Sequence, residues 1–260
     1  MTSIPPEKPP LLEVQHLQKS FGPRPVLTDV SFEVPAGEVL SILGRSGTGK
    51  SVLLKCIIGL LETDAGKVFY KGAPLDSPAV LSQLRQASSY VFQHNALFDT
   101  ATVFENVLMP LRARGKNTRE EWEQKVHSVL RRLELEEAAE RYPAELSGGM
   151  QKRLAVARAL VTEPELVFFD EPTAGLDPLR RNAVFSMVSE LQRERGFTAI
   201  LVTHDVQEAL VVSSRILWLD AGRLRFNGEA LSFTESQDPE LIEFRDSIEA
   251  LRAALKKTRS

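Results

Sequence analysis

The segment GRSGTGKS, residues 44–51, lies between two strongly apolar runs and constrains the fold more than any other part of this sequence. The run before it, VLSIL (39–43), has the length of a buried strand, and the run after it, VLLKCIIGLL (52–61), has the length of a helix. Because glycine tolerates backbone angles that other residues avoid, the glycines of the segment permit a tight turn between the two runs. The sequence therefore predicts a strand, a glycine-rich turn and a helix buried on most sides.

Strands and helices alternate again in the second half of the chain. We expect a strand at 166–169, a helix at about 178–194, a strand at 198–203, a helix at about 206–213 and a strand at 215–219. Strands that alternate with helices indicate a parallel sheet covered on both faces. The predicted fold class is therefore α/β, with a mostly parallel sheet.

Residues 11–43 are rich in strand-forming residues and predict an antiparallel β subdomain at the N-terminal end of the core. Within them SFEVPAGEVLSIL (31–43) has two strand-like runs around Pro-Ala-Gly and predicts a hairpin. A second hairpin is predicted in ILWLDAGRLRFNGE (216–229), around Ala221 and Gly222, at the end of the core.

Residues of about 97–165 have a different character, because they are charged and helical. Five apolar residues fall on one face of a predicted helix in this region, namely Trp122, Val126, Val129, Leu130 and Leu133. We predict a helical subdomain inserted into the sheet-based core. The whole chain is then a disordered lead-in (1–10), one large domain (11–235) and a C-terminal helical extension (236–260).

Charge and composition limit the partners of this chain. The net charge is −3 and the sequence pI is about 5.9, so no overall basic surface predicts binding to nucleic acid. Its single cysteine, Cys56, excludes an intramolecular disulfide and is read as a core residue. The apolar runs are shorter than the roughly 18 residues of a spanning helix, and residues 1–10 lack the apolar segment of a secretory signal. We expect a cytoplasmic protein whose membrane role, if it has one, requires a partner chain.

Polar residues follow each apolar strand of the predicted parallel sheet. Gln93 follows SSYVF, the pair Asp170 and Glu171 follows LVFF, and His204 follows AILVT. Ligands of open α/β sheets bind at the carboxyl ends of the strands. The convergence of GRSGTGKS with these four side chains at one edge predicts a site for phosphate, magnesium and water.

The glycine-rich segment matches the P-loop pattern G-x-x-x-x-G-K-[ST] of nucleotide-binding proteins. Its backbone N–H groups and the N-terminus of the next helix suit phosphate oxygens. Lys50 reaches the β- and γ-phosphates in this pattern, where a unit charge pair at 4 Å is worth roughly 4 kcal/mol near a protein surface. The predicted phosphate-binding residues are Gly44, Arg45, Ser46, Gly47, Thr48, Gly49, Lys50, Ser51 and Val52. The pattern makes ATP and Mg²⁺ the expected cofactors, with Ser51 as a magnesium ligand.

The four side chains after the other strands have further expected roles. Asp170 is suited to hold Mg²⁺, and Glu171 is suited to act as the general base toward an attacking water. Gln93 is suited to orient water or contact Mg²⁺, and His204 to contact the γ-phosphate or relay a conformational change. Adjacent acids can instead begin a turn, and a loop amide or a lone histidine is often purely structural, so these alternatives stay open for each residue alone.

The stretch ELSGGM (145–150) is unusual because two glycines lead into a predicted helix. Glycine costs about 1 kcal/mol relative to alanine inside a helix. Ser147 can cap this helix, yet one glycine suffices for a turn. Ser147, Gly148 and Gly149 together place a hydroxyl, bare N–H groups and a helix N-terminus at one point, which is the chemistry of a second anion site.

The order of these motifs resembles that of ABC-transporter ATPase subunits. The P-loop, Gln93, LSGGM (146–150), LVFFDE (166–171), AGLD (174–177) and His204 follow one another as in that family, over about 11–235. The resemblance implies a homodimer in which Ser147, Gly148 and Gly149 of one subunit cover the γ-phosphate in the P-loop of the other. It also implies that Phe21 stacks on adenine and that Asp177 bridges the dimer.

Within that family, three stretches look most similar to the ATPases of bacterial phospholipid transporters of the Mla type. They are residues 44–61, residues 93–112 and the signature ending in Met150. This resemblance implies a membrane permease and an MCE-domain protein as partners, and a location on the inner face of the inner membrane. The alternatives are an importer ATPase for amino acids or another small solute and, less favoured, a soluble ABC protein without a transport role.

The C-terminal stretch predicts a capped amphipathic helix. Asp238 is the expected N-cap, Pro239 follows at the first helical position, and the apolar stripe is Leu241, Phe244, Ile248, Leu251 and Leu255. This helix either packs on its own domain or docks on the neighbouring ATPase subunit.

Overall fold

The computed structural model describes residues 9–115 and 118–245. The strands in these residues are β1 (Leu12–Phe21), β2 (Arg24–Val34), β3 (Val39–Leu43), β4 (Ala65–Tyr70), β5 (Ala73–Pro74), β6 (Ser88–Val91), β7 (Leu166–Asp170), β8 (Thr198–Thr203), β9 (Arg215–Asp220) and β10 (Arg223–Glu229). The helices are α1 (Lys50–Ile57), α2 (Pro78–Ala87), α3 (Val103–Arg114), α4 (Arg119–Arg132), α5 (Gly148–Leu160), α6 (Pro178–Arg195), α7 (Val206–Val212) and α8 (Ala230–Glu235). Two short 3-10 turns, η1 (Glu136–Ala138) and η2 (Pro143–Glu145), connect α4 to α5.

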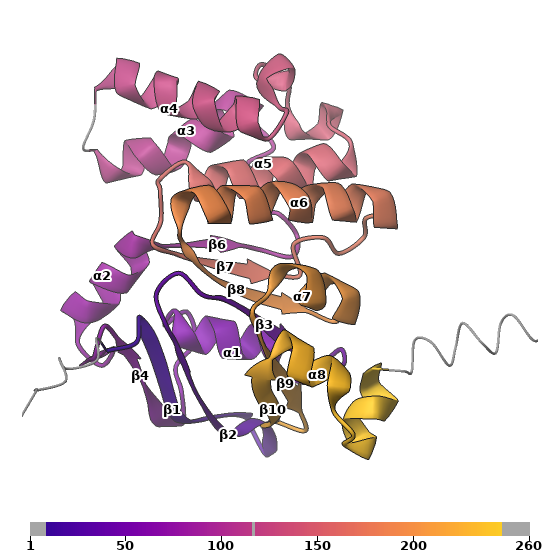
Figure 1. The fold of residues 1–260 in the computed structure, drawn as a ribbon. Coiled ribbons are helices and arrows are strands. Elements are labelled where there is room, and N and C mark those ends of the chain that lie inside the picture. Colours follow the sequence, from indigo (N-terminus) through magenta and orange to yellow (C-terminus); the bar gives the residue numbers. More distant parts are fainter. Residues whose placement is uncertain (1–8, 116–117, 246–260) are drawn as a thin grey trace, which may run out of the picture.

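The strands form one sheet with an antiparallel end and a parallel end (Figure 1). Its order is β5-β4-β1-β2-β10-β9-β3-β8-β7-β6. Strands β1, β2, β4 and β5 pair antiparallel, whereas β9, β3, β8, β7 and β6 are parallel neighbours. The predicted α/β fold with a mostly parallel sheet core and an antiparallel N-terminal part is confirmed.

One of the two predicted hairpins is wrong. The runs on either side of Pro-Ala-Gly form β2 and β3, but β10 and β9 lie between these strands in the sheet. The Gly37 N–H donates to Thr198 Oγ1 at 2.8 Å, so the turn leads β3 toward the start of β8 rather than back along β2. The run Val39–Leu43 is also buried on both faces, as suits an interior strand of a parallel sheet.

The other hairpin is confirmed, because β9 and β10 are antiparallel with Asp220 opposite Arg223. Ala221 and Gly222 have φ of 46° and 76°, and positive φ at both central residues is the mark of the tight turn that matches strand twist.

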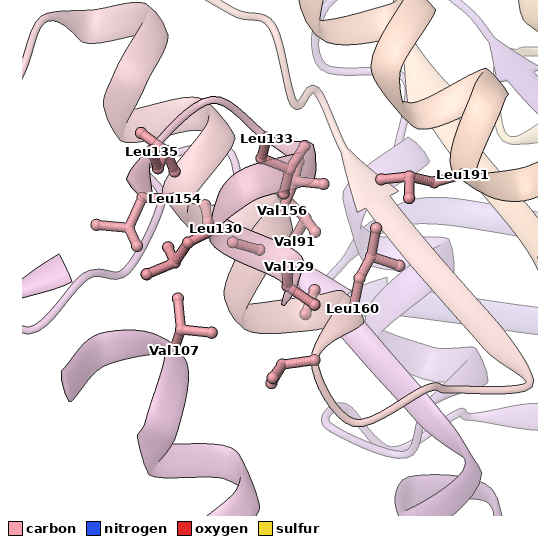
Figure 2. Packing of buried hydrophobic residues seen from close by; sticks show 14 of the residues in the cluster. Val91, Val107, Val129, Leu130, Leu133, Leu135, Leu154, Val156, Leu160 and Leu191 are labelled. Carbon is pink, nitrogen blue, oxygen red and sulfur yellow. The ribbon is translucent and has the colours of Figure 1, made fainter. Parts of the chain in front are cut away.

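The sheet separates two apolar clusters because its side chains alternate between the faces. In β7, Val167 and Phe169 pack on the side of α3, α4, α5 and α6, while Leu166 and Phe168 pack on the side of α1. Figure 2 shows the first cluster, where the helices bring Val107, Leu130 and Leu154 together. Burying each such side chain contributes about 1.5–3 kcal/mol, so the sheet is held in place from both sides.

The helices begin and end at residues that satisfy their free backbone groups. Thr102 caps α3 in a reciprocal pair with Glu105, and Thr118 does the same for α4 with Glu121.

The first helix is shorter than its apolar run, because α1 ends at Ile57 and Gly59 has φ of 68°. The apolar run therefore does not stay buried to its end.

The end of the described chain packs on its own domain. Asp238 Oδ1 accepts the N–H groups of Glu240 and Leu241, as the predicted N-cap should. Leu241 and Phe244 are buried against β9, where the Phe244 and Trp218 rings stack with centroids 5.3 Å apart. The other predicted stripe residues, Ile248, Leu251 and Leu255, and most of the predicted disordered lead-in lie outside the described residues. No helix within 9–115 and 118–245 is long and apolar enough to cross a membrane.

Candidate active site

The glycine-rich loop joins the end of β3 to the start of α1, where its shape depends on glycine at two positions. A Cβ atom on Gly44 would lie 2.4 Å from the Leu219 carbonyl oxygen, so no larger residue fits there. Gly49, the residue before α1, has φ of 100°, a conformation that side chains with a Cβ rarely adopt. Gly49, Lys50 and Ser51, at the start of α1, line a cavity, and a helix N-terminus is where free N–H groups suit an anion.

Lys50 is held inside this loop rather than in solvent. Its residue is 5% exposed, and its Nζ donates to the carbonyl oxygens of Gly44 and Arg45 at 2.9 Å and 3.0 Å. Burial lowers the pKa of the Lys50 ammonium, while the charges of Glu171 and Asp170 act in the opposite direction. The loop thus carries a partly desolvated positive charge beside two carboxylates.

Ser51 and Asp170 meet at the first turn of α1. Ser51 Oγ donates to Asp170 Oδ1 at 2.6 Å, and the Tyr90 hydroxyl donates to Asp170 Oδ2 at 2.9 Å. Burial, and then the nearby Asp170 charge, raise the pKa of Tyr90, so the phenol remains protonated and keeps donating. The serine hydroxyl and the carboxylate are hard oxygen donors of the kind that Mg²⁺ binds together with phosphate.

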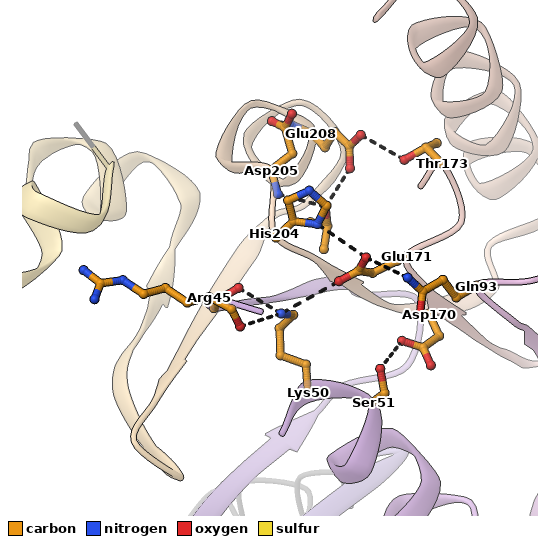
Figure 3. Close-up of polar contacts among 12 residues, drawn as sticks. Arg45, Lys50, Ser51, Gln93, Asp170, Glu171, Thr173, His204, Asp205 and Glu208 are labelled. Carbon is orange, nitrogen blue, oxygen red and sulfur yellow. Dashed lines mark hydrogen bonds and ion pairs between the residues drawn. The ribbon is translucent and has the colours of Figure 1, made fainter. Parts of the chain in front are cut away.

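Glu171 lies at the centre of the strand-end residues, as Figure 3 shows. Its Oε1 is 3.9 Å from Lys50 Nζ, and its Oε2 is 3.4 Å from both Gln93 Nε2 and His204 Nδ1. The residue has φ of 47°, which is uncommon for a side chain with a Cβ, and its N–H donates to the Val202 carbonyl oxygen at 2.9 Å. Its side chain is 15% exposed, so it remains accessible to a small reactant. The structure thus brings together the residues expected at the ends of three strands, namely Gln93, Asp170, Glu171 and His204.

A cavity of about 530 Å³ opens beside these groups. Its lining residues are Phe21, Arg24, Val26, Ser46, Gly47, Gly49, Lys50, Ser51, Val52, Gln93 and Glu171. Phe21 is 50% exposed at the end of β1, and Lys19 Nζ lies 5.7 Å from the centroid of its ring. Arg45 and Thr48 do not line the cavity, because Arg45 pairs with Glu243 at 3.5 Å and Thr48 Oγ1 donates to the Arg45 carbonyl oxygen at 2.9 Å. These two residues shape the loop from its outer side.

The glycine pair that follows Ser147 is not part of this cavity. Ser147 caps α5 by accepting the Met150 N–H at 3.4 Å. A Cβ atom on Gly148 would come no closer than 3.7 Å to Leu176, and one on Gly149 no closer than 3.6 Å to Arg180. Both are ordinary contact distances, so packing within residues 9–115 and 118–245 does not require either glycine.

Asp177 lies near the glycine pair and not at the P-loop. It is the N-cap of α6, where its side chain accepts the Arg180 N–H at 3.0 Å, and this hydrogen bond lowers its pKa. The residues predicted to contact nucleotide therefore fall into two groups on one chain, one at the cavity and one at the start of α5 and α6.

Two contacts at the site were not predicted from the sequence. Tyr90 holds Asp170, and Lys152 Nζ donates to the Gln93 carbonyl oxygen at 2.6 Å. Lys152 is 6% exposed on α5, and burial lowers its pKa. Nothing in the helical spacing distinguishes Lys152 from a surface lysine, whereas Tyr90 at the end of the strand before Gln93 gave a usable signal.

Comparison with protein families decides the identity of this arrangement. Residues 27–174 match the family model described as ABC transporter. The chain belongs to the ABC transporter family. Its members include the glutamine transport ATP-binding protein GlnQ of Escherichia coli (strain K12), which is 42% identical over 220 residues, covering 84% of this chain and 91% of GlnQ. This chain is accordingly an ABC ATPase that binds ATP.

Longer relatives and solved structures agree with this assignment. The sulfate/thiosulfate import ATP-binding protein CysA of Bacillus cereus (strain ATCC 10987 / NRS 248) is 40% identical over 84% of this chain, which spans 61% of that protein. CbiO1 of Clostridium perfringens, part of the ABC transporter complex CbiONQ, has a TM-score of 0.81 at 29% identity, covering 95% of this chain and all of CbiO1. The dimeric structure of MJ0796, a bacterial ABC transporter cassette, has a TM-score of 0.76 at 31% identity, covering 84% of this chain and 98% of MJ0796. The fold is that of an ABC ATPase.

The finer expectation of an Mla-type ATPase does not gain support from these comparisons. The relatives named above transport glutamine and import sulfate or thiosulfate. They fit the alternative of an amino-acid or small-solute importer better than the lipid-transport expectation. A partner with an MCE domain likewise gains no support.

Proposed function

We propose that this chain is the ATP-hydrolysing subunit of an ABC importer, and that it drives a separate membrane permease from the inner face of the membrane. The observation that carries the proposal is the cluster of Lys50, Gln93, Glu171 and His204, of which the first three line the P-loop cavity. A carboxylate beside one buried cation, an amide and an imidazole is suited to activate a water molecule.

Two copies of the chain are proposed to share each ATP. The start of α5, with Ser147, Gly148 and Gly149, lies apart from the cavity of its own chain, and no contact among the described residues requires its glycines. A second copy arranged head to tail supplies this segment to the γ-phosphate held by the P-loop. The dimer of MJ0796 supports this arrangement. Phe21 is proposed to stack on adenine and Asp177 to lie at the subunit interface.

Magnesium fits the residues at the end of β7. Ser51 and Asp170 are adjacent oxygen donors, and Mg²⁺ binds through one or two such groups together with nucleotide phosphates. Gln93 lies near this pair, because its Nε2 donates to Oε2 of Glu171, the residue after Asp170. When bound, the ion neutralises phosphate charge, while Lys50 contributes a fixed positive charge and Tyr90 holds Asp170 in place.

The relatives support a small solute as the transported substrate, namely an amino acid or an inorganic oxyanion. The second candidate is a phospholipid, favoured by the likeness of residues 44–61 and 93–112 to Mla-type ATPases. Phe98 in the latter stretch is 48% exposed and lies 5.8 Å from the Arg158 guanidinium, whereas Leu97 packs into the core. Phe98 and Met109, which is 37% exposed, are thus the large apolar side chains of that stretch available to a permease.

Reconstitution with a candidate ABC permease from the same organism tests the proposal and separates the two candidates. We expect the two proteins to co-purify, and ATP hydrolysis in proteoliposomes to rise when an amino acid or sulfate is supplied with its binding protein. Hydrolysis that responds to no solute, with phospholipid enriched in the purified complex, would favour the lipid candidate. A chain that binds no permease and drives no transport would contradict the proposed function.

A further inference from the structure

A buried carboxylate joins the two loops that carry the proposed catalytic side chains. Glu208 lies in the first turn of α7 and is 7% exposed. Its Oε1 accepts the Thr173 hydroxyl at 2.9 Å, and its Oε2 accepts the Thr203 hydroxyl at 2.6 Å. Figure 3 shows Glu208 and Thr173 linked beside His204. Both threonines are almost fully buried, so water does not replace either hydrogen bond.

Each threonine is close in sequence to one of the side chains at the cavity. Thr173 comes two residues after Glu171, in the turn between β7 and α6, and Thr203 comes directly before His204. Strands β7 and β8 are neighbours, and the last pair in their register is Asp170 with Val202, before the turn after β7 and the loop after β8. Beyond the paired strands, Glu208 connects the turn after β7, through Thr173, to the end of β8, through Thr203.

Arg181 adds a second connection between the same loops. Its Nη1 donates to Asp205 Oδ2 at 2.5 Å, and its Nη2 donates to the Leu176 carbonyl oxygen at 3.4 Å. Its Nε lies 3.1 Å from Glu208 Oε1 without the alignment of a hydrogen bond, so that contact is purely electrostatic. The Arg181 guanidinium thus compensates the buried charge of Glu208. It also holds the carbonyl group of Leu176, which directly precedes Asp177.

Burying the Glu208 carboxylate costs free energy, because the charged group loses its contact with water. Burial raises the pKa of Glu208, and the hydrogen bonds from Thr203 and Thr173 oppose that shift. An apolar residue of similar size would pack at this position without the cost of taking a charge out of water.

We propose that Glu208 is a positioning residue for ATP hydrolysis: through Thr173 and Thr203 it fixes the turn that begins at Glu171 relative to His204. The proposal rests on the function proposed above, because it gives Glu171 and His204 the roles assigned there. Movement of the 173–177 turn is then transmitted to His204 through one carboxylate.

The substitution Thr173→Val tests this role, because it removes the hydroxyl and keeps the shape of the side chain. We expect kcat for ATP hydrolysis to fall about 3- to 10-fold, the effect of one buried hydrogen bond. The KM for ATP should change less than about twofold, because no P-loop contact is altered. Thr173→Ser keeps the hydroxyl and should return kcat to within about twofold of the original value.

The matched control is Thr198→Val at the opposite end of β8. Thr198 is fully buried and its hydroxyl accepts the Gly37 N–H at 2.8 Å, but it lies far from Glu208 along the strand. We expect this variant to keep its kcat. Thermal unfolding of each variant identifies any that is not folded. Equal losses of kcat in the two valine variants would overturn the proposal, as would full activity in Thr173→Val.

A double-mutant cycle with His204→Ala distinguishes positioning from a general effect on stability. If Glu208 acts by placing the turn relative to His204, Thr173→Val should lower kcat by less than about twofold once His204 is removed. The same 3- to 10-fold loss in both backgrounds would contradict the proposal. Failure of the underlying function is recognised separately, since Glu171→Gln would then hydrolyse ATP at the normal rate.

Discussion

Glutamine in place of Glu171 is expected to slow ATP hydrolysis about 10²- to 10⁴-fold, the range for loss of a general base. Glutamine has the same size, but only its carbonyl oxygen accepts hydrogen bonds, so it keeps part of the contacts with Lys50, Gln93 and His204 and does not take up a proton. ATP binding should persist, because the P-loop is unchanged. The variant should therefore accumulate as an ATP-bound dimer on gel filtration, and a single-turnover assay should show bound ATP that is not cleaved.

Glu165→Gln is the matched control for this experiment. Glu165 directly precedes β7, at the opposite end of the strand from Glu171, and pairs with Lys71 at 2.8 Å. It undergoes the same change of charge without approaching the cavity, so hydrolysis should stay normal. If Glu171→Gln also turned over ATP normally, another group would have to be the base.

Loss of the Lys50 ammonium is expected to weaken ATP binding about 30-fold or more, since removal of one partner of a buried charge pair costs about 2–5 kcal/mol. Lys50→Ala removes the hydrogen bonds from Nζ to the carbonyl oxygens of Gly44 and Arg45 and removes the buried cation of the loop. The Kd for ATP, measured by calorimetry in the presence of Mg²⁺, should rise accordingly, and hydrolysis should be lost.

Lys55→Ala serves as the control for Lys50→Ala. Lys55 lies on the same helix, α1, but its side chain is exposed and does not line the cavity. Its removal should leave the Kd unchanged. A Lys50→Ala chain that bound ATP as tightly as the Lys55→Ala chain would show that the lysine does not contact phosphate.

Features that depend on neighbouring residues were predictable from the sequence. The loop at 44–51 is determined by its own glycines, and the turn at Ala221 and Gly222 requires only positive φ at two adjacent positions. The strand-end residues Asp170, Glu171 and His204 were also found, because parallel strands bring their carboxyl ends to one edge.

Features that depend on distant pairing were not predictable in the same way. The hairpin expected at 31–43 failed because two strands from the end of the chain, β9 and β10, insert between β2 and β3. Lys152 and Glu208 contact the site or its loops from other elements, and no local pattern marks them. The transported substrate was not predictable either. Under both candidate functions, residues 44–61 and 93–112 contact nucleotide or neighbouring protein and not the substrate.

The central claim is that each ATP site is built from two chains, and mixing two inactive variants tests it most directly. Lys50→Ala removes the phosphate contact on one side, and Ser147→Arg places a bulky side chain at the start of α5 on the other. Ser147→Ala reports the loss of the helix cap alone, which costs about 1 kcal/mol of stability.

Neither Lys50→Ala nor Ser147→Arg alone should hydrolyse ATP, because every site in each homodimer is damaged. In an equal mixture half of the dimers are mixed, and each of these has one intact site, so hydrolysis should recover to at most about a quarter of the original rate. Recovery of this size in the mixture, with no activity in either pure variant, is the predicted result. Full activity in either pure variant, or a mixture no more active than its parts, would contradict the shared site.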